Sequence, residues 1–182
     1  MTRYAVADAA RPGMNLRPAT LSDASSLAAL SIEVWVGTYL RRGVNGFFAD
    51  FVLSDLTPTK FETLLADPNE HFVVSQNIDG IDGYVRLTSG RAHPDGVGSD
   101  TEVTTLYVQP RHHGVGIGAG LLHRALTICD ERGVGQPWLM VNAENDRAIA
   151  FYRRHGFVET GQTHFRINDQ GYLNCVMSYG IR

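Results

Sequence analysis

The sequence predicts one mixed α/β (α+β) domain, in which a central sheet is flanked by helices. Three observations predict this class. β-rich runs alternate with segments of helical periodicity along the chain. The 182 residues contain no Gly-, Pro- or Ser-rich linker that would divide them into two units. The apolar fraction of 43% and the charged fraction of 19% are typical of a globular protein and exclude a mainly disordered chain.

The first elements are a strand and a capped helix. Asn15–Pro18 predicts a short strand, and Thr20 with Asp23 three positions later has the spacing of a capping box. Apolar residues then recur on one helical face: Leu27, Leu30 and Val34. Gly37–Ser54 is aromatic and interrupted by glycines, which indicates a second, broken helical segment.

The next segments change from helical to strand periodicity. A proline at the first helical position predicts a short helix, Pro58–Ala66. His71–Gln76 and Gly83–Thr88 are predicted as two strands joined by a turn at Asp79-Gly80. A polar loop over residues 90–100 follows them.

The second half of the chain alternates strands and helices. Glu102–Val108 predicts a central strand, which Pro110 ends. Residues 114–132 form the best helical segment, and its wide apolar face must pack on a sheet. A strand, a helix ended by Gly156 and two closing strands complete the prediction: Trp138–Val141, residues 148–155, Phe157–Thr160 and Leu173–Ser178.

Charge and hydropathy exclude two classes of partner. Sixteen Lys and Arg against nineteen Asp and Glu give a net charge of −3, so nucleic-acid binding through bulk charge is not expected. No apolar run approaches the ~18 residues of a spanning helix, so no membrane partner is expected. The first thirteen residues lack the long apolar stretch of a secretory signal. We expect residues 1–13 to be a loose N-terminal extension and residues 14–180 to form the domain.

The cysteines and histidines predict no metal site. Cys129 and Cys175 lie in apolar segments without a metal or redox spacing, and they are predicted to be small core residues. Free thiols of this kind fit a reducing, cytoplasmic location best. His112 and His113 have no second ligand pair that is spaced to join them.

The segment between the central strand and the long helix carries the clearest functional signal. Gly114, Gly116 and Gly118 let the backbone approach a ligand closely and leave N–H groups pointing outward. The helix N-terminus adds a partial positive charge, so the segment predicts a phosphate site. Arg111, just upstream, supplies a permanent cation and bidentate hydrogen bonds.

Three kinds of phosphate site compete for this segment. A P-loop needs Gly-Lys-Ser/Thr after its glycines, whereas the single lysine of the chain is Lys60. A dinucleotide site needs glycines directly after the strand and an acidic residue at the end of a second strand. Here Gln109–His113 intervenes and Asp130 and Glu131 lie on the helix itself, so that site fits poorly. The third candidate is the diphosphate of coenzyme A.

Two motifs resemble a known family. Arg111-His-His-Gly114-Val-Gly116 is similar to the Arg/Gln-x-x-Gly-x-Gly/Ala signature of the GNAT N-acetyltransferase superfamily. The run Asn145-Asp-Arg-Ala-Ile-Ala-Phe-Tyr152-Arg-Arg-His-Gly156-Phe157 resembles its second signature, and the resemblance covers roughly residues 14–179. It implies a single GNAT domain with a central, mostly antiparallel mixed sheet of about seven strands, flanked by helices, and a splayed strand pair at the cofactor site.

The resemblance implies acetyl-CoA as co-substrate and no metal. Pantetheine would pair with the backbone of the central strand, and the diphosphate would lie in the glycine loop. The implied cofactor-binding residues are Leu106, Tyr107, Val108, Arg111, His113, Gly114, Val115, Gly116, Ile117, Gly118, Ala119, Asn145 and Tyr152.

The resemblance also implies two catalytic residues. Tyr152 matches the tyrosine that faces the thioester sulfur and would protonate the departing thiolate. Glu102 matches the base of histone-acetylating relatives and would remove the proton of the acceptor amine through water. The Val108 N–H would hold the oxyanion. Because neither cysteine lies in a motif segment, we expect direct transfer without an acyl-enzyme.

The acceptor is expected to bind to the first half of the chain. Its candidate contacts are Glu33, Trp35, Tyr39 and Asp50, because aromatic rings and carboxylates hold an ammonium group together. The layout resembles bacterial polyamine acetyltransferases of the PaiA kind, which implies a small primary amine. A protein or peptide N-acetyltransferase is one alternative, and a non-catalytic acyl-CoA sensor or interaction module is another. Dimers are common in the family, so a homodimer and a monomer both stay open.

Structural roles stay open for the same residues. Tyr152 shares a helical face with Phe151 and can be a core aromatic residue. Asn145 can act as a helix cap alone, or as a cap that also contacts the ligand. Trp35 can pack inward, as can Tyr39, and Glu102 can belong to a structural ion pair.

Overall fold

The computed structural model describes residues 14–40, 43–96 and 98–180 of the chain, so the predicted extension over residues 1–13 lies outside the described residues. These residues form a seven-stranded sheet in the order β1-β2-β3-β4-β5-β7-β6. All neighbouring strands are antiparallel except β4 and β5, which are parallel. The strands are β1 Asn15–Pro18, β2 Glu70–Gln76, β3 Ile81–Thr88, β4 Glu102–Val108, β5 Trp138–Asn142, β6 Phe157–Ile167 and β7 Gln170–Tyr179. The α-helices are α1 Ala24–Tyr39, α2 Gly46–Asp55, α3 Pro58–Ala66, α4 Ile117–Glu131 and α5 Asp146–Arg154.

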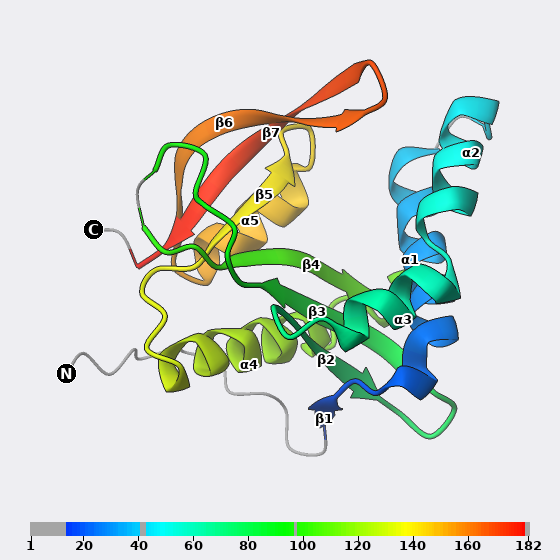
Figure 1. Ribbon diagram of the computed structural model, residues 1–182, viewed down its shortest axis with the longest axis horizontal. Coiled ribbons are helices and arrows are strands. Elements are labelled where there is room, and N and C mark those ends of the chain that lie inside the picture. The colour runs from blue at the N-terminus through cyan, green and yellow to red at the C-terminus, as the bar shows by residue number, and fades with distance from the viewer. Residues whose placement is uncertain (1–13, 41–42, 97, 181–182) are drawn as a thin grey trace.

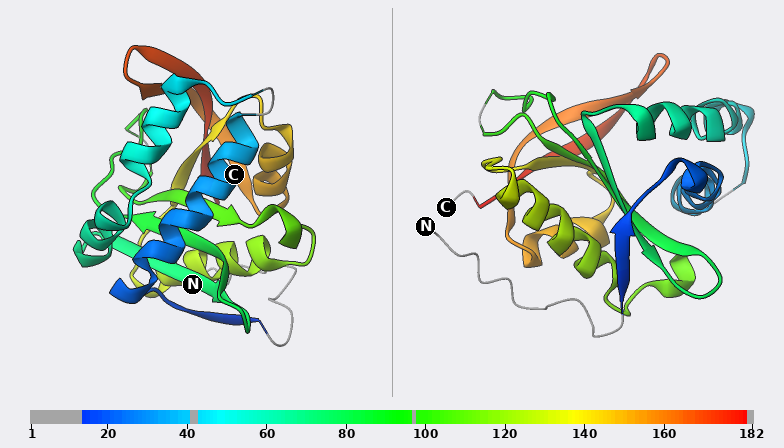
Figure 2. Two further views of the ribbon diagram at one scale, coloured as in Figure 1. Left: turned by 90° about the vertical axis from the view of Figure 1, so that its right-hand side faces the viewer. Right: turned by 60° about the horizontal axis from the view of Figure 1, so that its bottom comes forward.

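Helices cover the two faces of the sheet unequally (Figures 1 and 2). On one face α4 and α5 form the larger core, where Leu121 and Leu122 of α4 are fully buried against Val85 of β3. On the other face α1 and α3 cover β2 and β3, and Leu27 packs with Phe61 there. The helix α2 lies farther along this second face, beyond α1. The predicted flanked sheet is therefore confirmed.

The sequence pattern located most elements well. The strands β1 and β4 and the helix α3 have the predicted bounds. The capping box of Thr20 and Asp23 is present, and a short 3-10 turn after it leads into α1. Arg17 donates two hydrogen bonds of 2.8 Å to the Asp23 carboxylate, which lowers the pKa of that carboxyl to about 2. This ion pair ties the start of α1 to β1.

The helix predicted over residues 114–132 begins later than expected. Gly114 and Gly116 have φ angles of 82° and 93°, and Gly116 is the N-cap of α4, whose first residue is Ile117. A left-handed backbone cannot continue a right-handed helix. The two glycines therefore belong to a loop that turns back onto the helix N-terminus.

The closing strands are longer than predicted. Phe157–Thr160 and Leu173–Ser178 were expected, whereas β6 and β7 form a long hairpin with its turn at Asn168-Asp169. The apolar pattern marks only the part of β7 that pairs with β5, from Asn174 to Ser178. The outer half of the hairpin extends beyond β5 and is mostly exposed on both faces, so it lacks the alternation that predicts a strand.

The strands β4 and β5 separate soon after they meet. Their only pair is Glu102 with Trp138, whereas β4 pairs with β3 along its whole length. The predicted splayed strand pair is therefore confirmed, and it lies at the centre of the sheet (Figure 1). The carboxyl ends of the two strands point toward the N-terminus of α4 and toward α5.

Candidate active site

A cavity of about 400 Å³ opens between the end of β4, the start of α4 and one face of α5. Its described lining comes from four parts of the chain. They are Val34, Thr38 and Tyr39 of α1; Leu106, Tyr107 and Val108 of β4; His112, His113, Gly114, Gly116, Gly118 and Ala119 of the glycine loop and α4; and Asn145, Arg147, Ala148, Phe151, Tyr152 and Arg154 beside and on α5. The cavity therefore brings together the two predicted motifs and the end of α1.

The backbone of β4 faces this cavity. The His113 Nε2–H donates a hydrogen bond of 2.9 Å to the Val108 carbonyl, which shows that this carbonyl points away from β3 and into the splay. Backbone groups of alternate residues point to the same side of a strand, so those of Leu106 also face the splay. An extended ligand can pair with β4 here in place of a neighbouring strand.

The glycine loop has the geometry of an anion site. The left-handed Gly114 and Gly116 turn the loop around the N-terminus of α4, where backbone N–H groups and the helix dipole favour negative charge. A Cβ on Gly114 would meet no atom within 4 Å, so this part of the loop borders open space. The His112 Nδ1 atom is buried without a hydrogen-bond partner in the described structure. No Asp or Glu is found among the described lining residues, so the cavity suits a polyanionic ligand.

Tyr152 lies on the cavity wall among other aromatic rings. Its ring centroid is 5.3 Å from that of Phe151 and 5.7 Å from that of Phe157. Burial raises the pKa of Tyr152, so its hydroxyl stays protonated through the neutral range. The ring therefore packs on the core and also faces the cavity, and the catalytic role of Tyr152 stays a prediction.

Asn145 both caps the helix α5 and lines the cavity. Its Oδ1 accepts a hydrogen bond of 3.1 Å from the Ala148 N–H, so it caps α5. Asn145 also lines the cavity, and its side-chain amide has donors beyond the bond that makes the cap. The cap fixes this side chain at the cavity edge.

The aromatic acceptor candidates separate into one residue at the cavity and one in the core. Tyr39 lines the cavity, and burial raises its pKa while a hydrogen bond from Asn142 lowers it. Trp35 is 5% exposed and packs 4.6 Å from the Tyr39 ring, with Phe48 and Phe51 on its other sides. Trp35 supports the position of Tyr39 and offers no open face to a ligand.

Glu33 and Arg111 pair with each other instead of facing the cavity. The Glu33 carboxylate accepts hydrogen bonds from Gln109 at 2.8 Å and from Arg111 at 3.0 Å, and both lower its pKa. Arg111 is the cation expected at the diphosphate, and here it joins the end of β4 to α1. Three further predicted residues also lie off the cavity lining: the exposed Asp50, the half-exposed Val115 and the buried Ile117.

Glu102 lies at the narrow end of the splay and outside the cavity lining. It is 2% exposed, and its carboxylate is 3.1 Å from the Arg91 guanidinium. Burial raises the pKa of Glu102, whereas Arg91 lowers it, and burial is the larger effect. Its predicted structural ion pair therefore exists, and a base role for Glu102 requires water between it and the acceptor.

Sequence reasoning missed seven residues of the lining. They are Val34, Thr38, His112, Arg147, Ala148, Phe151 and Arg154. Arg147, Phe151 and Arg154 are spaced four and three residues apart, so they share one face of α5. The second motif contains Arg147 and Arg154 at this helical spacing, so the sequence could have predicted that both arginines face the same site as Phe151.

The described part of the chain offers neither a membrane-spanning helix nor a cluster of metal ligands. None of its helices has the length and apolarity that crossing a bilayer requires. Residues 14–40, 43–96 and 98–180 contain no group of three or more His, Cys, Asp or Glu side chains arranged to hold a metal ion. Cys129 and Cys175 are both buried free thiols.

Comparisons with known proteins agree on one family. The model of the acetyltransferase (GNAT) family matches residues 40–157. An uncharacterized N-acetyltransferase of Mycobacterium tuberculosis is 31% identical over 86% of this chain and 97% of its own length. The N-alpha-acetyltransferase RimI of the same organism is 32% identical over 78% of this chain and 77% of its own length. The structure of PaiA N-acetyltransferase from Thermoplasma acidophilum with coenzyme A has a TM-score of 0.73 at 17% identity, and covers 92% of this chain and 98% of that one.

Proposed function

This chain belongs to the GNAT family of acetyltransferases, and on that premise we propose that it transfers the acetyl group of acetyl-CoA to a primary amine of a small, polyamine-like molecule. Acetyl-CoA is the co-substrate, and the cavity fits it. The cradle at Gly114 and Gly116 suits its diphosphate, and the free backbone edge of β4 suits its pantetheine arm.

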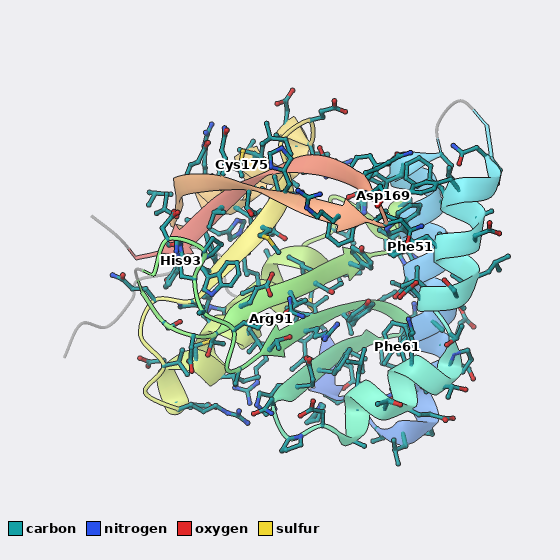
Figure 3. All side chains as sticks on the ribbon, turned by 45° about the horizontal axis from the view of Figure 1, so that its top comes forward. Phe51, Phe61, Arg91, His93, Asp169 and Cys175 are labelled. Carbon is teal, nitrogen blue, oxygen red and sulfur yellow. The ribbon has the colours of Figure 1, made fainter. Side chains whose placement is uncertain are left out.

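The contact between α2 and the β6–β7 hairpin carries the proposal of a small acceptor. In Figure 3 the outer end of the β6–β7 hairpin, labelled at Asp169, projects toward α2, on which Phe51 is labelled. Phe48 packs 5.9 Å from Tyr172, and Phe51 packs 6.4 Å from Phe165. These contacts join α2 to the outer half of the hairpin, and Phe48 and Phe51 also pack around Trp35, next to Tyr39 on the cavity wall. We infer that this joined wall bounds the acceptor side, which favours a short molecule over a polypeptide that must extend on both sides of the reacting amine.

The proposed chemistry is a direct displacement. The neutral amine nitrogen forms a bond to the acetyl carbon, and the carbon–sulfur bond then breaks to leave the amide and the CoA thiolate. The proton that the nitrogen loses as the amide forms replaces the one that Tyr152 gives to the thiolate. Glu102 removes the proton of the ammonium group through water, since an alkylammonium has a pKa of about 10.4. The Val108 N–H holds the developing oxyanion, and Tyr152 gives its proton to the thiolate. Tyr39 contacts the acceptor through its ring face.

One relative favours a second candidate function. The N-alpha-acetyltransferase RimI is 32% identical to this chain, so N-terminal peptide acetylation is the alternative. We also propose a cytoplasmic location, because acetyl-CoA and the two free thiols both suit a reducing compartment.

Thiol release from acetyl-CoA tests the proposed function. The purified protein is supplied with spermidine, short diamines and peptides with a free N-terminal Ala, and kcat/KM is measured for each. We expect kcat/KM for the small amines to exceed that for the peptides at least tenfold, or about 1.4 kcal/mol in transition-state binding. A preference for peptides would support the RimI-like alternative. Binding of acetyl-CoA without turnover of any amine would support the sensor reading.

The arginines of α5 predict a contact with the 3′-phosphate of CoA. Arg147 and Arg154 line the cavity about 10 Å apart along the helix axis, given a rise of 1.5 Å per residue. They therefore bracket a ligand with separate anionic groups. We expect Arg147→Gln combined with Arg154→Gln to weaken CoA binding about tenfold, and dephospho-CoA binding much less.

Arg153→Gln is the matched control for this experiment. Arg153 lies on the same helix but pairs with Glu159 at 3.1 Å and is absent from the cavity lining. Calorimetric titration gives the Kd of each protein for both ligands. Equal losses for CoA and dephospho-CoA would contradict a 3′-phosphate contact.

A further inference from the structure

A buried ion pair marks the point where β4 and β5 part. The Glu102 carboxylate is 2% exposed, and its Oε2 accepts a hydrogen bond of 3.1 Å from the Arg91 guanidinium. A carboxylate this deeply buried needs a charged partner to stay ionised. Glu102 also forms the single pair between the two strands, with Trp138.

The backbone of Arg91 is held in place on both sides. Its N–H donates to the Asp100 carbonyl at 2.7 Å, and its own carbonyl accepts from the Trp138 Nε1–H at 3.2 Å. Because Trp138 is the strand partner of Glu102, the same residue fixes both members of the ion pair. The side chain of Arg91 is nevertheless 48% exposed, so part of it faces solvent while its guanidinium bonds to the buried Glu102.

His93 anchors the segment that carries Arg91. Its Nδ1 accepts a hydrogen bond of 3.1 Å from the Asp95 N–H, so its Nε2 carries the proton and donates to Ser178 at 3.1 Å. A histidine in this tautomer cannot deprotonate Ser178, which excludes a serine nucleophile here. The contact instead holds the chain around His93 against β7.

The other charges around Glu102 are already paired. Arg86 of β3 donates to Glu70 of β2 at 2.7 Å, and this pair is more buried than that of Arg91. Thr88 and Thr104 link Glu70 to the β4 side of the network. The adjoining strand β5 contributes the uncharged Trp138. Arg91 is thus the cation that bonds directly to Glu102, while Arg86 acts on it from a distance.

We propose that Arg91 is a positioning residue, whose guanidinium holds the Glu102 carboxylate as a correctly placed anion for receiving the proton of the acceptor amine. The inference rests on the proposed function, in which Glu102 takes that proton through water. It gives Arg91 a role in the reaction although Arg91 does not line the cavity, with the proton passing along water between β4 and β5 to Glu102.

The inference predicts a shift in the pH profile. Removal of the Arg91 charge takes away the largest effect that opposes burial and leaves only the weaker ones of Arg86 and Thr104, so the pKa of Glu102 rises and more of it is protonated near neutrality. Since only the ionised carboxylate can accept the proton, the acid limb of kcat/KM must move to higher pH. We expect a shift of about one unit for Arg91→Gln or Arg91→Met, hence an approximately tenfold loss on the acid limb and little loss at alkaline pH. Arg91→Lys keeps a cation and is expected to restore most of the profile.

Arg124→Gln is the matched control, because Arg124 forms an exposed pair with Glu131 at 3.2 Å on the far helix α4. Thermal unfolding of each variant identifies any loss of folding. Arg91→Met keeps the apolar stem of the side chain, so it replaces Arg91→Gln if that variant is unstable. The KM for acetyl-CoA should stay constant in all variants.

A second measurement does not depend on turnover. The carboxyl ¹³C signal of Glu102, assigned with Glu102→Gln, is titrated in the protein without substrates. We expect its titration to move up by about one unit in the Arg91 variants and to stay in place in Arg124→Gln. An unchanged titration together with an unchanged acid limb would overturn the inference. Wild-type turnover by Glu102→Gln would instead show that the proposed base is wrong, and the inference would fall with it.

Discussion

Tyr152→Phe is expected to lower kcat by a factor of about 10²–10⁴, the range of a lost general acid. The substitution removes only the hydroxyl, so the contacts of the ring with Phe151 and Phe157 remain. Burial raises the pKa of Tyr152, and it also raises the pKa of a thiol that leaves in the same surroundings. The pKa of Tyr152 and the pKa of the thiol that it protonates therefore rise together. The Kd for acetyl-CoA should change less than twofold, because the hydroxyl acts after binding.

Tyr172→Phe is the control for this change. The Tyr172 hydroxyl donates to Gln170 at 2.6 Å on the exposed hairpin, so its loss should leave kcat near that of the wild type. Single-turnover measurement of thiol release separates the chemical step from product release. If Tyr152→Phe retained full kcat, the thiolate would have to take its proton from another group. A rise in KM alone would show that the phenol serves in binding.

Gly116→Ala is expected to weaken acetyl-CoA binding by a factor of about 5–30. Gly116 has a φ angle of 93° at the N-cap of α4, where a side chain costs about 1–2 kcal/mol. The free protein relieves this strain by moving the loop out of its cradle geometry. Binding must restore that geometry, so the cost appears in the Kd. Titration calorimetry of the variant and the wild type measures the change.

Gly133→Ala separates backbone strain from ligand binding. Gly133 follows α4 with a φ angle of 65°, and a Cβ there meets no atom within 4 Å. The strain of Gly133→Ala should lower the melting temperature, whereas Gly116→Ala should lower it less because its loop relaxes in the free protein. Only Gly116→Ala should affect the Kd. Equal affinities of the two variants for acetyl-CoA would contradict the cradle.

The sequence was most informative where one short segment contains the whole site. The strand β4, the glycine loop and the N-terminus of α4 follow one another along the chain, so their spacing alone predicted the anion cradle. The second motif predicted Asn145 and Tyr152, and both line the cavity. Residues that are close in the sequence are also close in space at these positions, so the sequence alone could predict that they share a site.

The rest of the site depends on contacts between distant segments. Arg111 was expected at the diphosphate, yet it pairs with Glu33, which lies 78 residues away on α1. Trp35 was expected at the acceptor, yet helix α2 covers it with Phe48 and Phe51. The periodicity of a sequence does not predict which distant charged residue will pair with a given side chain, or which aromatic ring will pack on it. The roles of Arg111, Glu33 and Asp50 toward ligands stay predictions.

Because β4 and β5 share a single residue pair, the sheet consists of two halves that are joined along one weakly paired line. The strands β1–β4 form one half and β5–β7 the other, and Glu102 with Trp138 is the one strand pair given between them, at one end of the line where they meet. The pantetheine arm of a bound cofactor would act as the missing strand between them. Such a ligand stabilises the folded chain by mass action, and does so along the line where it is weakest. Cells short of acetyl-CoA would therefore hold this enzyme in its least stable form.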